Sequence, residues 1–377
     1  MTPWEKLEIL GAAASYDHSC TGTGLSPELP ATLEGRRRLP GIYLAQTSSG
    51  RKLPLLKVLL TNRCRFHCAY CVNRAGASGP RAAFEPRELV EVALELWRRR
   101  LIQGVFLSAA VERSADETME RMLATARLLR RSYGFSGYLH LKILPGSSPE
   151  LIKEAVHLAT RVSANLEFVR GATLRRLAPE KEKRRLVAAL VQAREAALEA
   201  GKSPSLTTQV IVGAGPETDY DYLRLAQNLY RQGLLSRMYF SAYLPVSRHP
   251  ALPSPETLPP VIRERRLYQA DYLLRLYGFT YEELLAPGEN LPLDRDPKEA
   301  WAERHPEFFP VDLAQAPYEE LLRVPGLGPK TARRILQARR EGGLTFEGLR
   351  RLGVRLSRAA PYILLRGRRP PTNLHLF

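Results

Sequence analysis

The sequence has few cysteines, four among 377 residues, and this scarcity excludes a disulfide framework as a source of stability. Cys64, Cys68 and Cys71 fall within eight residues, which leaves Cys20 alone. No uninterrupted apolar run approaches the roughly 18 residues that a membrane span needs, and residues 1–10 lack the apolar core of a signal peptide. We therefore expect a soluble, cytoplasmic protein with no membrane partner.

Acidic residues are also scarce relative to basic ones, with 39 Asp+Glu against 56 Lys+Arg and a formal net charge of +17. Such a balance indicates a polyanionic partner if the positive charge is clustered. Residues 318–369 hold 13 Lys+Arg and 4 Asp+Glu, a net charge of +9, so about half of the excess lies in about a seventh of the chain. The charge is clustered near the carboxyl terminus.

Apolar strand-like runs alternate with amphipathic helix-like stretches from residue 55 onward. The expected strands are 55–60, 103–109, 138–144, 162–169, 206–213 and 237–244. The expected helices are 86–100, 115–133, 148–159, 180–200, 217–232 and 259–277. Parallel neighbours need crossover helices, so six such repeats predict an α/β fold with a partial (β/α)6 TIM-like barrel. In such curled sheets the chemistry lies at the carboxyl ends of the strands.

Three cysteines follow the first expected strand with the spacing CxxxCxxC. Three thiolates on one loop can bind three irons of a [4Fe-4S] cluster and leave the fourth iron open to a small molecule. A zinc site usually has four Cys or His ligands in spaced pairs, and His67 fits neither usual zinc spacing. Three incidental buried cysteines are the remaining alternative.

This spacing, with Tyr70 just before the last cysteine, resembles the radical S-adenosylmethionine (SAM) superfamily. The resemblance implies a [4Fe-4S] cluster ligated by Cys64, Cys68 and Cys71, whose open iron binds the amino and carboxylate groups of SAM. One electron then cleaves SAM to a 5'-deoxyadenosyl radical, which abstracts a hydrogen atom from the substrate. We expect the electron to come from a donor such as flavodoxin or ferredoxin.

The same resemblance makes the ends of later strands candidate SAM contacts. Small residues stand after the second strand where the family has a glycine-rich turn, and residues 209–217 are similar to its GxIxGxxE strand, with Gln209 in place of the first glycine. Alternatively, these residues are ordinary polar residues at strand ends or are packed in the core, with no contact to SAM. The candidate contacts are Tyr70, Ser108, Ala109, Asn165, Glu167, Ile211 and Gly213.

Two further residues are candidates for catalysis. Lys142 lies on the third expected strand among apolar neighbours, where a charge is costly to bury without a carboxylate or ligand partner. Cys20 is either a small buried apolar residue or a thiol near the radical site that returns a hydrogen atom or anchors a cluster or the substrate.

The stretch PGLGPK, residues 325–330, lies between two short predicted helices in the basic carboxyl-terminal region. Its two glycines permit a tight hairpin, and the exposed N–H groups that begin the second helix form a phosphate site. The stretch resembles a helix-hairpin-helix DNA-binding motif, although some such units make protein contacts. The candidate DNA contacts are Gly326, Gly328, Lys330, Thr331, Arg333 and Arg334.

Together these features resemble the radical SAM proteins assigned to DNA modification or repair. The predicted parts are an amino-terminal extension (1–50), the radical SAM core (51–277), a linker packed on the core (278–316), a small all-α helix-hairpin-helix domain (317–369) and a tail (370–377). We expect a DNA base or sugar to be modified. Whether a DNA repair glycosylase is also a partner is left open by the sequence. The alternatives are modification of structured RNA and a nucleic-acid-binding protein with a structural or redox-sensing cluster.

Overall fold

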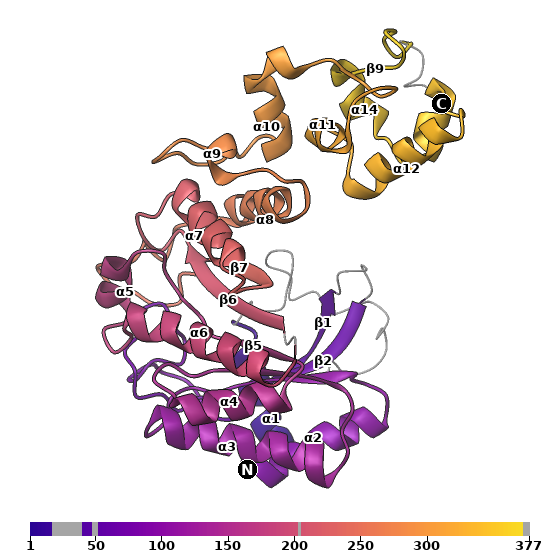
Figure 1. The fold of residues 1–377 in the computed structure, drawn as a ribbon. Coiled ribbons are helices and arrows are strands. Elements are labelled where there is room, and N and C mark those ends of the chain that lie inside the picture. The colour runs from indigo at the N-terminus through magenta and orange to yellow at the C-terminus, as the bar shows by residue number, and fades with distance from the viewer. Residues whose placement is uncertain (17–39, 47–51, 203–204, 372–377) are drawn as a thin grey trace. The chain divides into compact units, whose positions relative to one another are not determined.

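The computed structural model describes residues 1–16, 40–46, 52–202 and 205–371 (Figure 1). The chain forms two compact units. The first consists of Met1–Glu217 and Asn228–Glu264, and the second of Thr218–Gln227 and Arg265–Phe377. None of the described residues belongs to a helix with the length and apolarity needed to cross a membrane.

The first unit contains a curled seven-stranded sheet whose strands are ordered as they occur in the chain. Strands β2 to β7 are parallel, and β1 pairs with β2 in the antiparallel direction. The six parallel strands confirm the predicted partial barrel. The strands are β1 Ile42–Gln46, β2 Lys52–Leu59, β3 Gly104–Ser108, β4 Tyr138–Lys142, β5 Arg161–Ser163, β6 Ser205–Val212 and β7 Arg237–Ala242.

Helices connect the parallel strands, and Figure 1 shows α2, α3, α4 and α6 packed side by side along one face of the sheet. Several of these helices start at residues that favour a helix amino terminus. Pro86 is the first residue of α2, and the Ser114 side chain accepts a hydrogen bond from Glu117 N at the start of α3. The helices are α1 Pro3–Ala14, α2 Pro86–Arg98, α3 Ala115–Arg127 with a π-helical continuation Leu128–Ser132, α4 Pro149–Leu158, α5 Gly171–Leu177, α6 Lys183–Glu199, α7 Asp219–Arg231 and α8 Val261–Leu276.

Alternation along the strands gives the sheet an apolar and a polar face. On β4, Leu139 and Leu141 lie on one face, and the alternate residues His140, also fully buried, and Lys142 lie on the opposite face. His140 bonds through Nε2 to Ser163 Oγ on β5 at 2.8 Å. The side of the sheet away from the helices therefore carries polar groups, as a binding site inside a barrel requires.

Strand β5 is shorter than the predicted 162–169. The hydroxyl of Thr208 on β6 donates to Ala164 O (2.7 Å) and accepts from Leu166 N (3.0 Å), so a side chain replaces the backbone ladder there. Pairing with β6 resumes at Glu167, whose N–H donates to Gln209 O and whose φ is +60°. The interruption places Glu167 in a left-handed turn instead of a strand.

The second unit is mainly helical with one two-stranded parallel pair, and its core is built around Leu321, Leu327, Ile335 and Leu349. Val311, Leu313 and Ala316 also belong to this core, although they fall in the stretch predicted as a linker. The domain boundaries themselves stay a prediction. The elements are α9 Tyr281–Leu284, α10 Pro297–Arg304, a 3-10 turn Pro306–Phe308, β8 Val311–Asp312, α11 Tyr318–Arg323, α12 Pro329–Arg340, α13 Phe346–Arg351, α14 Leu356–Ala359, a 3-10 turn Ala360–Tyr362 and β9 Ile363–Leu364.

Candidate cofactor site and nucleic-acid interface

The cysteine loop follows β2 at the carboxyl edge of the sheet, and the Arg81 side chain holds it in shape. The guanidinium of Arg81 donates to four backbone carbonyl oxygens: those of Asn62 (2.6 Å), Asn73 (3.1 Å), Arg74 (2.9 Å) and Ala77 (3.0 Å). A loop with little regular structure would otherwise leave these acceptors to water. One planar cation with five donors thereby fixes both ends of the cysteine segment.

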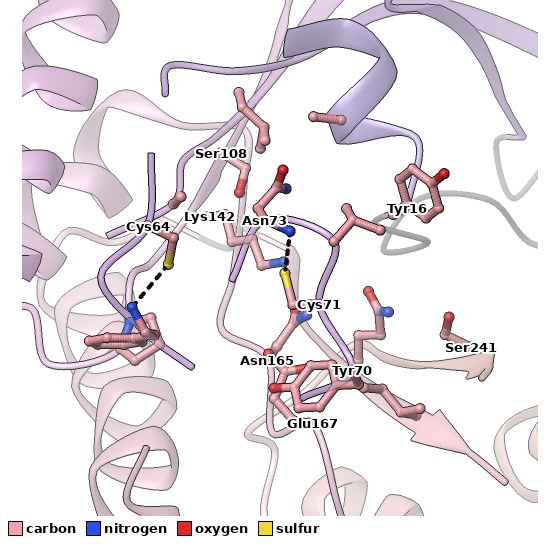
Figure 2. Close-up of a pocket in the computed structure, with 18 of the residues that line it drawn as sticks. Tyr16, Cys64, Tyr70, Cys71, Asn73, Ser108, Lys142, Asn165, Glu167 and Ser241 are labelled. Atoms are coloured by element: carbon pink, nitrogen blue, oxygen red, sulfur yellow. Dashed lines mark hydrogen bonds between the residues drawn. The ribbon is translucent and has the colours of Figure 1, made fainter. Parts of the chain in front are cut away.

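Two of the three thiols accept backbone hydrogen bonds in the loop. Phe66 N donates to Cys64 Sγ and Asn73 N donates to Cys71 Sγ, each at 3.4 Å, as the dashed lines in Figure 2 show. His67 points elsewhere, because its Nδ1 lies 2.7 Å from Glu180 Oε1 and its side chain is 68% exposed. The loop thus presents sulfur ligands, and its histidine makes a surface hydrogen bond with Glu180 instead.

Burial shapes the chemistry of the thiols. It raises the pKa of Cys68 to about 11, whereas the positive charge of Lys181 acts in the opposite direction. Burial likewise raises the pKa of Cys71. Metal binding at such a site releases the thiol protons. Within the described part of the chain, no three His, Cys, Asp or Glu side chains are close enough to hold a single metal ion; a cubane has no such requirement, because each thiolate binds a different iron.

A cavity opens beside this loop, at the carboxyl ends of the strands (Figure 2). Most of the predicted cofactor residues line it, together with the predicted catalytic Lys142. Those residues are Cys64, Tyr70, Cys71, Ser108, Ala109, Lys142, Asn165, Glu167 and Ile211. The fold therefore brings together side chains that are up to 147 positions apart in the sequence, from Cys64 to Ile211.

Two predicted residues, Cys68 and Gly213, are not part of the cavity lining. Cys68 is buried beneath the loop, with 5% of its surface exposed. Gly213 has a φ of +87°, and a Cβ there would lie 2.7 Å from Pro260 Cγ, so this glycine permits the turn after β6. Cys20 lies outside the described residues, and its role stays a prediction.

A buried lysine that the sequence did not single out lies at the floor of the cavity. Lys181 Nζ donates to Glu167 Oε1 (2.7 Å) and to Tyr70 OH (3.1 Å). Burial alone would lower the pKa of Lys181, but the neighbouring Cys68, Glu167 and Tyr70 raise it above its ordinary value. This lysine is therefore a permanent positive charge beside the cysteine loop.

The donors around the cavity fit a [4Fe-4S] cluster with SAM. Thiolates are the ligands that iron-sulfur clusters use, and Asn165 supplies a second kind of evidence. Its Oδ1 is buried and has no hydrogen-bond partner within the described residues. An acceptor left in this way at a cavity wall suits a hydroxyl or amine of a bound molecule.

The predicted hairpin lies in the second unit, between α11 and α12. Gly326 has a φ of +82°, and Leu327 is 3% exposed within the core. Gly328 caps α12, and Lys330, Arg333 and Arg334 are exposed along its first turns. Their exposed charges can contact a polyanion.

One of the predicted DNA contacts faces the protein interior. Thr331 is 9% exposed, and its hydroxyl donates to Gly353 O at 3.2 Å. The hydroxyl therefore already has a partner inside the unit, and its contact with DNA stays a prediction.

Comparison with family models matches residues 58–229 to the radical SAM superfamily and residues 311–338 to the helix-hairpin-helix motif. No curated protein matches the chain.

Solved structures similar to this chain include three that are 11–14% identical to it. The [FeFe]-hydrogenase maturase HydG from Carboxydothermus hydrogenoformans is 13% identical, with a TM-score of 0.45 over 57% of this chain and 50% of that one. Methylornithine synthase (PylB) is 11% identical, with a TM-score of 0.44 over 56% of this chain and 60% of that one. Coproporphyrinogen III oxidase (HemN) from Escherichia coli, which is described as a radical SAM enzyme, is 14% identical. Its TM-score is 0.35 over 55% of this chain and 48% of that one. The chain thus spans about half the length of these structures.

Proposed function

We propose that this radical SAM enzyme, with its radical SAM domain over residues 58–229 and its helix-hairpin-helix motif over residues 311–338, modifies or repairs DNA at a base or sugar. One observation carries the proposal: the same chain joins a cysteine loop that opens into a barrel cavity to a basic hairpin module. Radical chemistry and nucleic-acid binding are thus encoded together.

In the proposed site, Cys64, Cys68 and Cys71 would hold three irons of a [4Fe-4S] cluster. When bound, the cluster and SAM supply a 5'-deoxyadenosyl radical that removes a hydrogen atom from a substrate. The chain's own contribution is to shape and shield the site. Arg81 fixes the loop, and the N–H groups of Phe66 and Asn73 donate to sulfur, which tunes an iron-sulfur cluster.

The cavity walls divide between polar and apolar roles. Asn165 and Glu167 offer oxygen acceptors to a hydroxyl or amine, and Lys181 orients Glu167 through their ion pair. Apolar side chains such as Ile211 and Leu244 line other walls and exclude water from a reactive intermediate. Lys142 stays a proposed catalytic residue that lines the same cavity.

The hairpin module would hold the DNA by its backbone. Lys330, Arg333 and Arg334 neutralise phosphates, and such contacts position nucleic acid without reading its sequence. A base or sugar deep in a cavity can be reached only if the nucleotide leaves the helical stack. We therefore propose a flipped nucleotide as the substrate.

The proposed reaction needs a one-electron donor, for which flavodoxin and ferredoxin are suitable carriers, and it is compatible with a DNA repair glycosylase acting before or after it. We place the enzyme in the cytoplasm, where thiols stay reduced.

The test is an anaerobic assay of reconstituted, reduced enzyme with SAM, and with no nucleic acid, single-stranded DNA, duplex DNA or duplex RNA. We expect DNA to stimulate formation of 5'-deoxyadenosine. Stimulation by RNA alone would reassign the substrate to structured RNA. No 5'-deoxyadenosine with any reductant would leave a nucleic-acid-binding protein with a structural or redox-sensing cluster.

A further inference from the structure

Four partly exposed aromatic side chains form a connected cluster in the second unit. The rings of Phe308 and Phe309, just after α10, have centroids 5.2 Å apart. The centroid of Phe309 lies 4.9 Å from that of Tyr362, because the parallel pair β8 and β9 brings their preceding segments together. His305 joins the cluster through Trp301, whose centroid lies 4.5 Å from that of His305 and 5.5 Å from that of Phe308. We call His305, Phe308, Phe309 and Tyr362 the aromatic patch.

The core next to the aromatic patch is better covered than the patch itself. Val311 and Ile363, paired on β8 and β9, are 4% and 0% exposed, and Trp301 is 5% exposed. Three rings of the patch, those of its phenylalanines and its tyrosine, pack against this core and yet keep part of their surface in solvent. Single apolar side chains at a surface are common, whereas a connected group of them marks an interaction site.

A basic turn, residues 365–369, follows β9. The Asp312 carboxylate on β8 accepts hydrogen bonds from Arg366 N (3.0 Å) and Gly367 N (2.8 Å), so the turn is tied to the strand pair. Two backbone hydrogen bonds close the turn, between its first residue and Arg368 (2.9 and 3.1 Å). The backbone that carries the arginines is therefore held in place against β8.

The arginines of the basic turn supply positive charge beside the aromatic patch. Arg366, Arg368 and Arg369 are exposed, and none of them forms an ion pair with another residue that the structure describes. Arg369 Nη1 donates to the carbonyl oxygen of Pro361 at 3.4 Å, and Pro361 directly precedes Tyr362. The turn thus joins cations to the rings.

Two carboxylates near Tyr362 already have positive partners. Burial and, to a smaller extent, the nearby charges of Glu303 and Glu299 raise the pKa of Tyr362. Glu303 forms an ion pair with Arg295, and Glu299 forms one with Arg358 at 3.2 Å. These acids therefore do little to cancel the charge of the basic turn, which suits a polyanion.

We propose that the aromatic patch and the basic turn bind an unpaired stretch of DNA, with bases stacked on the rings and phosphates on the arginines. Rings beside cations are what single-strand sites share, and every base offers a face to stack. A duplex keeps these faces inside its own stack. This role rests on the proposed function, because a nucleotide that leaves the stack creates an unpaired stretch.

The test is fluorescence anisotropy of the full-length protein with three labelled 20-nucleotide probes: single-stranded DNA, the same backbone without bases, and the matched duplex. The wild type should bind the single strand at least 5-fold more tightly than the abasic strand, because only the former can stack. Tyr362→Leu should weaken single-strand binding about 5- to 10-fold and leave the other two affinities within 2-fold. Tyr362→Phe keeps the ring and should stay within 2-fold for all probes.

Phe346→Leu is the matched control, because Phe346 is a partly exposed ring packed on the same core but outside the aromatic patch. It should leave every affinity within 2-fold. Arg368→Gln changes an exposed side chain and no packed ring, so it tests the site even if Tyr362→Leu lowers the melting temperature. It should reduce the slope of log K against log[salt] for the single strand by about 0.7.

Single-strand binding that is unchanged in both Tyr362→Leu and Arg368→Gln would assign the aromatic patch to packing or to a protein partner, while the proposed function stands. Equal loss of single-strand and abasic binding in Tyr362→Leu would also overturn base stacking. If the wild-type protein binds neither single strand nor duplex, the proposed function itself fails.

Discussion

Arg81 lies ten residues beyond Cys71, outside the cysteine spacing, yet its guanidinium donates to four carbonyl oxygens of the cysteine segment and its flanks. A cluster tolerates little displacement of its ligands, so the loop must be shaped before iron binds. A single side chain with five donors does this where a ladder of backbone bonds is absent.

We predict that Arg81→Met lowers the iron content of the reconstituted protein several-fold, because four backbone acceptors lose their donors and the thiols are no longer held together. Iron analysis and absorbance near 420 nm measure this. Arg63→Met is the control, since the Arg63 side chain is 56% exposed and, among the described residues, makes a single long contact of 3.5 Å with Glu112. Equal iron in the two variants would remove Arg81 from the site.

Lys298 is a buried lysine beside the hairpin of the second unit. Its Nζ donates to Leu327 O at 2.6 Å, and 5% of the residue is exposed. Burial lowers the pKa of Lys298 to about 7, with Asp296 acting against the shift and the charges of Arg358 and Arg323 adding to it. The lysine thus holds a carbonyl of the hairpin turn at the cost of an unfavourable buried charge.

This lysine predicts a pH dependence of stability. Below pH 7 the amine is protonated in both the folded and the unfolded chain, whereas between pH 7 and about 10.4 only the unfolded chain holds the proton. Stability therefore rises with pH across that window. Lys298→Met should flatten the rise, which melting temperatures of both proteins at pH 6, 7.5 and 9 would reveal. Parallel pH curves would contradict the assignment.

At the scale of secondary-structure elements, β3 fits between its neighbours because it begins with a glycine. A Cβ on Gly104 would lie 2.4 Å from Tyr138 O on β4 and 2.7 Å from Leu55 Cδ2 on β2. Both atoms belong to paired central strands that cannot move apart without loss of their ladder bonds. The curl of the sheet at this point thus depends on the missing side chain.

Gly104→Ala should therefore destabilise the protein by about 1–3 kcal/mol through overpacking. Urea denaturation followed by circular dichroism measures the change. Gly343→Ala provides the comparison, because its Cβ would meet no described atom within 4 Å and its φ lies outside the left-handed region; it should stay within about 0.5 kcal/mol. Similar values for both would mean that β3 can shift freely.

At the scale of the whole molecule, the two proposed activities belong to separate compact units. The cysteine loop lies within Met1–Glu217, and the hairpin lies within Arg265–Phe377. Each unit has buried apolar residues of its own, such as Leu141 in the first and Leu321 in the second. We therefore expect the hairpin module to fold without iron.

We predict that removal of the cluster leaves DNA binding intact. Protein treated with a chelator and reductant should bind a DNA duplex within 2-fold of the reconstituted protein at the same salt concentration, since the backbone contacts lie in the other unit. Anisotropy titrations of both forms measure this, with iron content confirming the removal. A 10-fold loss of affinity would show that the cluster organises the DNA-binding surface.

Sequence patterns that are local in the chain predicted the corresponding structures correctly. Alternating strands and helices predicted the six parallel strands, the CxxxCxxC spacing predicted a cluster loop, and PGLGPK predicted the hairpin. Each signal is confined to a short segment, so its geometry follows from backbone preferences and covalent spacing. The expectation that the chemistry lies at the carboxyl ends of the strands also pointed to Asn165 and Glu167, which line one cavity with Cys64 and Cys71.

The sequence by itself determined the cysteine loop, the order of the parallel strands and the turn at Gly326. Only the tertiary structure decided that β5 ends at Ser163, beyond which the Thr208 side chain of β6 takes over the hydrogen bonds, and that Lys181 meets Tyr70 across 111 positions. These features depend on contacts between residues far apart in the chain. Such contacts exist only after the elements have packed, and no periodicity or spacing within one segment encodes them.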